Sequence, residues 1–279
     1  MVVVPEPGTM TADEMQALAR GMNFAETAFV TTPANPEATF AVRCFTPTTE
    51  VAFSGHQLLG AAFVLSELGR LPETVTPVYA EVGGDLHTVV LGQPRDGGQG
   101  VAILERAAQF SLPIAEISAV TAALSLDAMA IIHTGLPVQV VETGLACLIV
   151  PVATLADIRA IMPAKQTLHE LLTDTSASCL LAFTQETLTP ANDVHVRVFA
   201  PPLGITEDPA TGTANAALAA YLIRHGVWLA NPVLRVRSEQ GSEVGRPSVI
   251  EMTVDASAEP MTVLVGGRVA KSVEGTVFY

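Results

Sequence analysis

The sequence predicts an α+β protein with two pseudo-symmetric lobes, in which strands surround one buried helix per lobe. Two segments carry this prediction, residues 55–69 and 212–226. Each begins and ends on glycine, the residue that commonly follows the end of a helix. Apolar side chains occupy every face in the interior of both segments. A helix that is apolar all round is buried inside its domain.

The surroundings of these two segments are also repeated. Residues 42–47 (Val-Arg-Cys-Phe-Thr-Pro) match residues 196–201 (Val-Arg-Val-Phe-Ala-Pro), and His56 corresponds to Thr213. Phe29 precedes the first match at the distance by which Phe183 precedes the second. Three matches in the same order indicate a duplicated unit of strand, turn and helix. A pseudo-twofold axis would direct both helix N-termini, with their unpaired N–H groups and partial positive charge, to one shared cleft.

The N-terminal lobe is expected to comprise residues 1–116 and 270–279. Residues 11–20 predict a capped helix, because Thr11 precedes two acidic residues and Met15, Leu18 and Ala19 share one face. Apolar runs separated by glycine-rich turns predict the strands that follow. These strands are 2–4, 24–30, 38–45, 51–53, 78–82, 86–91 and 101–105.

The C-terminal lobe is expected to comprise residues 117–269. Helical patterns cover 120–130 and 154–162, the second of which is capped by Thr154. Apolar runs predict strands at 133–141, 145–152, 179–184, 193–199, 233–238, 248–254 and 261–265. Gly266 and Gly267 predict a tight turn before the closing segment 269–278.

The composition excludes several classes of partner. The chain has 279 residues, 49% of them hydrophobic, and a net charge of −14. This charge argues against nucleic acid and anionic membranes as partners. No apolar run reaches the roughly 20 residues of a membrane span, and no signal peptide is visible, so we expect a cytoplasmic protein.

The chain lacks the sequence signatures of a metal or cofactor site. Its three cysteines form no CxxC pair, and its six histidines show no ligand spacing. Neither glycine-rich segment is a Walker loop or a GxGxxG fingerprint. We therefore expect no metal and no cofactor. A two-thiol racemase would need a cysteine at each buried helix start, and neither start has one.

Three residues are candidates for acid–base or binding chemistry. Glu26 lies just before an apolar strand, and the internal alignment pairs it with Leu180. Asp208 lies at the start of the second buried helix and His56 at the start of the first. Each has a plain alternative: Glu26 as a solvated acid, Asp208 as a helix N-cap, and His56 as a structural histidine. Glu207 is expected to be an exposed neighbour of Asp208.

Several motifs together resemble the PhzF-like family of phenazine biosynthesis. They are residues 22–30 (MNFAETAFV), 43–47 (RCFTP), 53–62 (FSGHQLLGAA), 207–214 (EDPATGTA), 239–241 (EQG), 245–248 (GRPS) and 265–267 (VGG). The resemblance runs from about residue 3 to the end of the chain. It implies the diaminopimelate-epimerase-like fold, in which each of two lobes curls an antiparallel sheet around a central helix. This agrees with the duplication.

The resemblance also implies roles for individual residues. In the isomerase of that family, the glutamate matching Glu26 is the proton shuttle, and residues matching His56, Asp208 and Thr213 hold a dihydro-hydroxyanthranilate. This chain differs by Thr213 where serine is common and by Gln57 where proline is frequent. It also lacks the family's first strand before 2–4. The edge so exposed predicts a homodimer, or coverage by 2–4 and the C-terminal segment.

We therefore expect a cofactor-independent isomerase that moves a proton on a small carboxylate, either dihydro-hydroxyanthranilate-like or amino-acid-like. Gly55, His56, Gly212 and Thr213 would bind the carboxylate at the two helix starts. Asp208 would orient an amino or hydroxyl group, and Glu26 would carry the proton. The alternatives are a cofactor-free epimerase or racemase of an amino or hydroxy acid, and a catalytically silent homologue that binds a small acid.

Overall fold

The computed structural model describes residues 1–51, 55–72, 77–92, 100–105, 108–114, 116–228, 233–255, 257 and 262–277. The chain divides into two compact units. Unit 1 is Met1–Leu104 with Gly266–Tyr279, and unit 2 is Glu105–Val265. In the part of the chain that is described, no helix is long and apolar enough to cross a bilayer.

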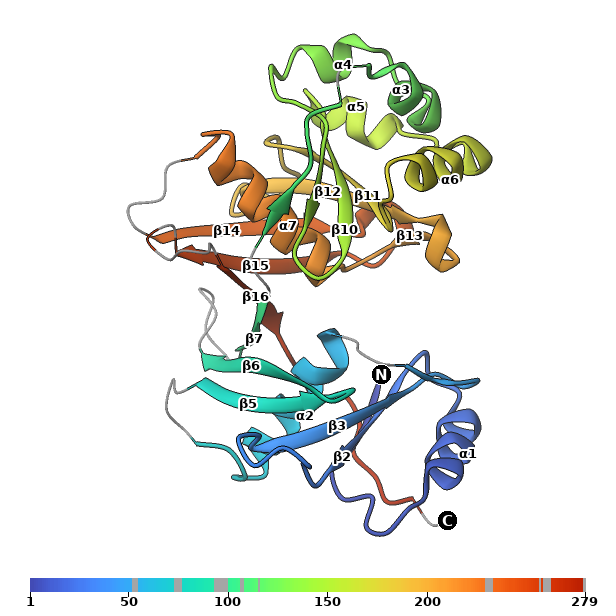
Figure 1. Ribbon diagram of the computed structural model, residues 1–279, viewed down its shortest axis with the longest axis vertical. Helices are drawn as coiled ribbons and strands as arrows, with labels where there is room; N and C mark the ends of the chain where they lie inside the picture. Colours follow the sequence, from blue (N-terminus) through green and yellow to red (C-terminus); the bar gives the residue numbers. More distant parts are fainter. Residues whose placement is uncertain are drawn as a thin grey trace. The chain divides into compact units, whose positions relative to one another are not determined.

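Unit 1 is a curled sheet with one helix against each face (Figure 1). Its strands lie in the order β1-β2-β3-β5-β6-β7, and β4 pairs with β3. Their bounds are β1 Val2–Val4, β2 Thr27–Thr31, β3 Phe40–Phe45, β4 Glu50–Val51, β5 Pro77–Val82, β6 Asp85–Gly92 and β7 Gly100–Glu105. The central helix is α2, Gly55–Glu67, and the outer one is α1, Ala12–Met22. Thr11 and Glu14 form the expected capping box at the start of α1.

The two faces of the unit 1 sheet bury different side chains. Ala28, Val30, Val42 and Cys44 pack against α2 in the central core. Phe29 and Phe45, which alternate with them along β2 and β3, pack against Met15 and Ala19 of α1. This alternation follows from the period of two in a strand.

Unit 2 repeats this plan with a longer sheet and more helices (Figure 1). Its strands lie in the order β16-β15-β14-β12-β11-β10-β9-β8, and β13 pairs with β12. Their bounds are β8 Gln109–Phe110, β9 Gln139–Glu142, β10 Ala146–Pro151, β11 Cys179–Thr184, β12 Val194–Ala200, β13 Ile205–Asp208, β14 Val233–Gln240, β15 Ser248–Asp255 and β16 Thr262–Arg268. Its helices are α3 Ser118–Leu124, α4 Met129–Ile132, α5 Leu155–Ala160, α6 Lys165–Asp174 and α7 Gly212–Arg224, with short 3₁₀ helices η1 Pro201–Leu203 and η2 Ser242–Val244.

The central helix of unit 2 confirms the prediction from its composition. Every residue from Ala214 to Leu222 is buried. The helix packs in a core with side chains of β9 to β12, β14, β15 and β16, while α3 to α6 cover the opposite face. Gly226 follows the helix with φ of 64°, a left-handed conformation that glycine adopts without strain.

The hydrogen bonding confirms the duplication residue by residue. In unit 1, β2 and β3 are antiparallel and β3 and β5 are parallel; in unit 2 the same holds for β11, β12 and β14. A bidentate ion pair joins β3 to β4 through Arg43 and Glu50. Its counterpart joins β12 to β13 through Arg197 and Glu207. The α+β fold with two similar lobes is therefore confirmed.

Some local predictions were wrong. Gly266 and Gly267 continue β16 instead of forming a turn, and neither has the positive φ that such a turn needs. The helix expected at 120–130 ends at Leu124, because Ser125 adopts a left-handed φ of 55°. A second short helix, α4, follows, so the strand expected from 133 begins only at Gln139. Helix α6 was not predicted. The residues at 52–53, expected to end a strand, lie outside the described part.

Candidate active site

Glu26 and His56 lie together in unit 1. Glu26 directly precedes β2, and its carboxylate forms an ion pair with Nε2 of His56 in the first turn of α2. The Glu26 side chain is 19% exposed, whereas that of His56 is 60% exposed. The carboxylate is therefore the more shielded member of the pair and the imidazole the more accessible one. Gly55, the first residue of α2, adjoins this pair.

Strand β1 holds the backbone at Glu26. The N–H of Val2 donates to the carbonyl oxygen of Glu26 at 3.0 Å, and the parallel pairing of β1 with β2 begins at Val2 and Thr27. Residues 2–4 therefore form the expected strand, on the edge of β2; the homodimer and the coverage by the C-terminal segment stay predictions.

Asp208 lies in unit 2, at the end of β13 instead of at a helix N-cap. The N-cap of α7 is Thr211, whose side chain does not cap the helix. Asp208 instead accepts a hydrogen bond from Thr211 Oγ1 at 2.6 Å and a longer one from the Ala210 N–H at 3.4 Å. The plain N-cap role considered for Asp208 is thus wrong, because the side chain is used to shape the turn that precedes the helix.

Two buried amides support this turn, and neither was predicted from the sequence. Gln240 Nε2 donates to the Asp208 carbonyl at 2.6 Å, and Asn215 Nδ2 donates to Gln240 Oε1 at 2.8 Å. Both side chains are fully buried. Gly241 completes the packing: a Cβ there would lie 2.5 Å from the Arg246 carbonyl oxygen and 2.7 Å from that of Pro209. The motif at 239–241 therefore fixes the motif at 207–214.

The N-terminus of α7 is suited to an anion. In the part of the chain the structure describes, the N–H groups of Gly212 and Thr213 meet no acceptor, and no side chain caps the helix. Backbone N–H groups and the helix dipole together favour a carboxylate at such an end. Within the described part of the chain, a Cβ on Gly212 would approach only Val265, at 3.8 Å, so this packing does not require glycine there. The Thr213 carbonyl accepts from Thr143 Oγ1 at 3.1 Å.

Gln57 is a further polar residue of α2. From the sequence it stood out only because proline is frequent at this position in the resembling family. Its side chain is fully buried, and among the residues that the structure describes neither Oε1 nor Nε2 has a hydrogen-bond partner. A buried amide without partners costs about 1–3 kcal/mol. It directly follows His56 in the first turn of α2.

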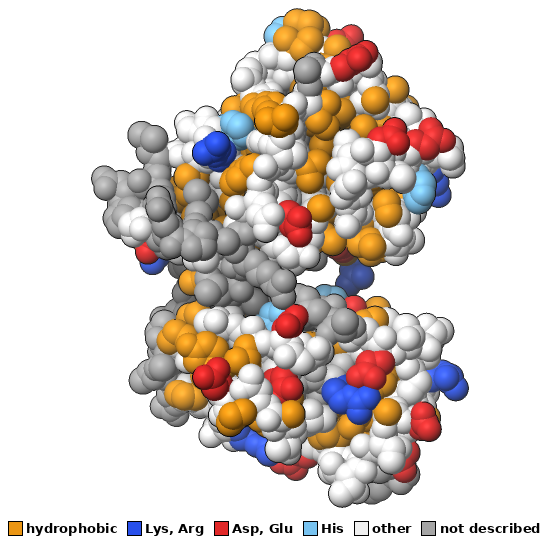
Figure 2. All heavy atoms as spheres, in the orientation of Figure 1, with side chains coloured by type: hydrophobic (Ala, Val, Ile, Leu, Met, Phe, Trp, Pro, Cys, Tyr) orange, Lys and Arg blue, Asp and Glu red, His pale blue; other side chains and the backbone are white. Residues whose placement is uncertain are grey.

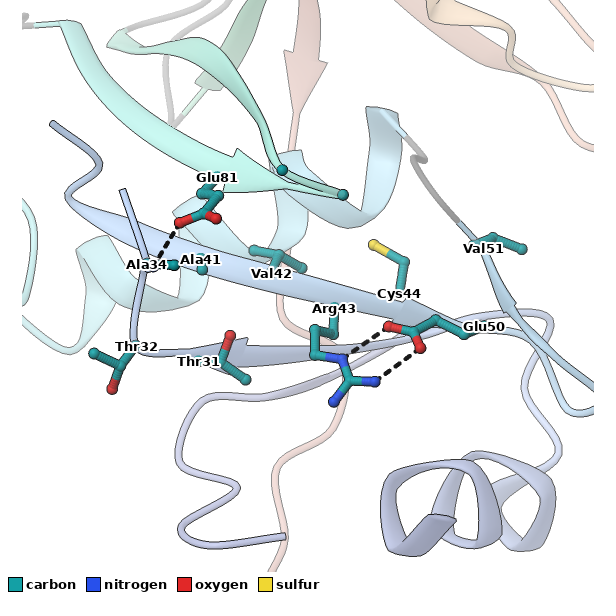
Figure 3. Close-up of a pocket in the computed structure, with 12 residues that line it drawn as sticks. Thr31, Thr32, Ala34, Ala41, Val42, Arg43, Cys44, Glu50, Val51 and Glu81 are labelled. Carbon is teal, nitrogen blue, oxygen red and sulfur yellow. Dashed lines mark hydrogen bonds and ion pairs between the residues drawn. The ribbon is translucent and has the colours of Figure 1, made fainter. Parts of the chain in front are cut away.

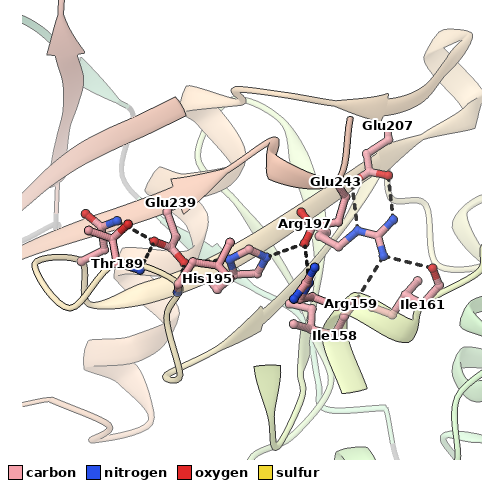
Figure 4. Close-up of polar contacts among 11 residues, drawn as sticks. Ile158, Arg159, Ile161, Thr189, His195, Arg197, Glu207, Glu239 and Glu243 are labelled. Atoms are coloured by element: carbon pink, nitrogen blue, oxygen red, sulfur yellow. Dashed lines mark hydrogen bonds and ion pairs between the residues drawn. The ribbon is translucent and has the colours of Figure 1, made fainter. Parts of the chain in front are cut away.

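A second polar cluster occupies the outer face of the unit 2 sheet (Figure 4). Its centre is His195, fully buried between Glu239 Oε1, 2.9 Å from Nδ1, and Glu243 Oε1, 3.1 Å from Nε2. Burial would lower the pKa of His195, but the hydrogen bonds to Glu243 and Glu239 outweigh it and raise the pKa.

The carboxylates of this cluster respond in the opposite sense. Burial would raise the pKa of Glu239, but donors led by Asn192 and the Leu188 N–H lower it. Burial would likewise raise the pKa of Glu243, but the contact with His195 outweighs burial and lowers this pKa.

Glu207 is only 10% exposed in its ion pair with Arg197, so the expectation that Glu207 is an exposed neighbour was wrong.

The distribution of acidic side chains and of possible metal ligands shows what kind of site the described residues can form. Figure 2 shows acidic side chains dispersed over the drawn face of both units. Among the residues that the structure describes, no group of three or more His, Cys, Asp or Glu side chains is placed to hold a metal.

Comparison with known proteins identifies the family. Residues 1–275 match the model of the PhzC-PhzF family, described as phenazine biosynthesis-like proteins. The chain belongs to this family. It is 31% identical over 270 residues to an uncharacterized isomerase of Escherichia coli named YddE, covering 94% of this chain and 87% of the relative.

A second relative carries a named activity. It is the trans-2,3-dihydro-3-hydroxyanthranilate isomerase of Pseudomonas chlororaphis, 29% identical over 273 residues, covering 96% of this chain and 87% of the relative. A PhzF-family protein of Bacillus anthracis superposes with a TM-score of 0.84 at 24% identity, covering 95% of this chain and 89% of that one. The diaminopimelate-epimerase-like fold is thus confirmed, and the chain is an isomerase of this family.

Proposed function

We propose that this protein is a cofactor-independent isomerase that moves a proton on a small carboxylate substrate by acid–base catalysis. The observation that carries the proposal is the contact between Glu26 and His56 at the start of α2. A carboxylate that is mostly shielded from water and is backed by an imidazole can take a proton from carbon and return it. Its counterpart in the repeat, Leu180, is fully buried and apolar, so the proposal rests on a single shuttle.

The remaining candidates are assigned to binding. Gly55 and His56 at the start of α2, and Gly212 and Thr213 at the start of α7, would each offer a helix N-terminus to a substrate carboxylate. Asp208 would orient an amino or hydroxyl group. Its Oδ2 accepts a short bond from Thr211, whereas Oδ1 accepts, among the described residues, only the long one from Ala210, which supports Oδ1 as the acceptor for a substrate donor.

The roles proposed for the site residues and the activity named for one relative together suggest the substrate class. A compound with a carboxylate, a neighbouring amino group and a transferable C–H proton fits these roles. Dihydro-hydroxyanthranilate has this pattern, and one relative is named for its isomerisation. An amino acid with an acidic C–H proton has it as well.

The test is solvent-deuterium incorporation. The purified protein, without added metal or cofactor, would be incubated in D₂O with trans-2,3-dihydro-3-hydroxyanthranilate and with a panel of amino and hydroxy acids. Mass spectrometry and NMR would report deuterium at carbon and a shifted double bond. Deuterium incorporation with inverted configuration would indicate an epimerase instead. No incorporation with any of these compounds would count against catalysis at Glu26.

A further inference from the structure

Unit 1 has a pocket on its outer face, beside β3 (Figure 3). Its volume is about 490 Å³, within the usual range for small-molecule sites. Its polar lining comes from Thr31, Thr32, Arg43, Glu50 and Glu81, and Ala41 also lines it. Glu26 and His56 do not line it.

The pocket has a counterpart in unit 2 that is filled by a side chain. Ala41 pairs with Glu81 across β3 and β5, and His195 pairs with Glu239 at the same place across β12 and β14. His195 thus stands where unit 1 has Ala41. Its two ring nitrogens form hydrogen bonds with the carboxylates of Glu239 and Glu243 (Figure 4).

In both units the carboxylate at this place accepts two consecutive backbone N–H groups. Glu81 Oε2 accepts the backbone N–H groups of Ala34 and Asn35, at 2.7 and 2.9 Å. Glu239 accepts those of Leu188 and Thr189, at 2.5 and 3.1 Å. These pairs of donors occupy equivalent positions after β2 and β11.

The two arrangements differ in what each carboxylate then contacts. Glu239 also receives the ring of His195 and the amide of Asn192. Both donors to Glu81 go to Oε2, and no described residue donates to Oε1. The turn after β5 is only Gly83 and Gly84, whereas the turn after β14 carries η2 with Glu243.

The charges along the pocket favour one kind of ligand. Arg43 is neutralised by Glu50 through two hydrogen bonds of 2.8 Å. Glu81 forms no ion pair with any described residue. The lining therefore carries a net charge of −1, which suits a monocation.

We propose that this pocket binds a small free cation with planar N–H donors, of the imidazolium type, with Glu81 Oε1 as its principal acceptor. The ligand occupies the place that the His195 ring takes in unit 2. Arg43 and Thr31 bound the site on the side of β3 and β2. The site is separate from the proposed proton shuttle.

The test uses imidazolium chloride as the probe, near pH 6, with the full-length protein. Affinity would be measured by calorimetry and the site located by NMR shifts or a crystal soak. The variants are Glu81→Gln, which removes the negative charge of the side chain, and Ala41→His, which places an imidazole side chain where the ligand is proposed to bind. The control is Glu37→Gln. Glu37 is an exposed carboxylate in the loop that contains Ala34 and Asn35, and it does not line the pocket. Tetramethylammonium, a cation without N–H donors, controls for charge alone.

We expect imidazolium to bind wild type and Glu37→Gln equally, with shifts at residues 34, 35 and 81. Glu81→Gln should weaken binding roughly tenfold or more, because a charge-assisted hydrogen bond is lost. Ala41→His should abolish it, and Glu26→Gln should leave it unchanged. Equal binding to Glu81→Gln, equal binding of tetramethylammonium, or no binding to wild type would each overturn the proposal. If Ala41→His does not fold, the comparison of Glu81→Gln with Glu37→Gln still decides.

Discussion

The carboxylate of Glu26 forms an ion pair with Nε2 of His56, so the residue before β2 and the first turn of α2 meet in one place. Thirty positions separate the two residues in the sequence, and no local pattern joins them. The sheet brings them together because β2 packs against the buried face of α2. The proposed proton shuttle therefore depends on the core of unit 1.

A substitution at Gly212 separates substrate binding from folding. The nearest atoms to a Cβ at this position are those of Val265 at 3.8 Å, so Gly212→Ala should leave the free energy of unfolding within about 1 kcal/mol of wild type. If a substrate carboxylate approaches the N–H groups here, the same methyl group should raise KM. Denaturant titration and steady-state kinetics would measure the two effects.

Gly241→Ala is the matched contrast to Gly212→Ala. Gly241 has φ of +87°, and a Cβ would lie 2.5 Å from the Arg246 carbonyl oxygen. It should lower the free energy of unfolding by roughly 1–3 kcal/mol. An unchanged KM in Gly212→Ala would argue against a substrate carboxylate at the N-terminus of α7.

The buried amide of Gln57 should cost stability. Gln57→Leu removes a fully buried group that has no hydrogen-bond partner in the described part of the chain, and we expect the free energy of unfolding to rise by about 1 kcal/mol. Asn215→Leu is the control, because Asn215 Nδ2 donates to Thr211 and Gln240; it should destabilise the protein. Destabilisation by Gln57→Leu would show that the amide has a partner in solution.

The charged centre around His195 should make stability depend on pH. Because the pKa of His195 is raised, its contribution is fully present below the unfolded value of about 6.5 and is lost as pH rises through the folded pKa. Because the pKa values of Glu239 and Glu243 are lowered, their contribution is present above about 4.3 and is lost as pH falls through the folded values. The cluster should thus stabilise most between about pH 4.3 and 6.5.

His195→Gln measures this contribution. Removing the cation from between two buried carboxylates, near Arg159 and Arg197, should cost roughly 3–5 kcal/mol near pH 6, and the difference from wild type should shrink at alkaline pH. His169→Gln, at an exposed site, should change little. Denaturant titrations across pH would measure both variants, and a difference that is constant with pH would show that His195 is neutral in the fold.

The sequence predicted the parts of the fold that are marked by local composition. Two helices apolar on every face, flanked by repeated residues, were enough to predict both lobes. Helix α6 was missed because Ala164 at its N-cap makes no side-chain cap, although Leu168, Leu171 and Leu172 follow helical spacing. The buried setting of Glu207 was missed because it comes from a pairing of β13 with β12.

The sequence predicted individual residues of the site but not the hydrogen bonds between them. Glu26, His56 and Asp208 were chosen because each lies near the start of a predicted strand or helix and within a motif that resembles the family. Gln240 and Asn215 were missed because their hydrogen bond joins residues 25 positions apart, and nothing local marks it. Contacts of this kind arise only once the sheet has formed.

The proton shuttle is the central claim, and Glu26→Gln tests it most directly. The variant keeps the size of the side chain and its contact with His56 but cannot carry the proton. With a substrate identified by deuterium incorporation, turnover and binding would be measured separately for wild type and variant. Glu37→Gln, an exposed change in the same unit, controls for loss of a carboxylate. The account predicts that Glu26→Gln lowers kcat by about 10²–10⁴ with substrate affinity nearly unchanged; full turnover by this variant would contradict it.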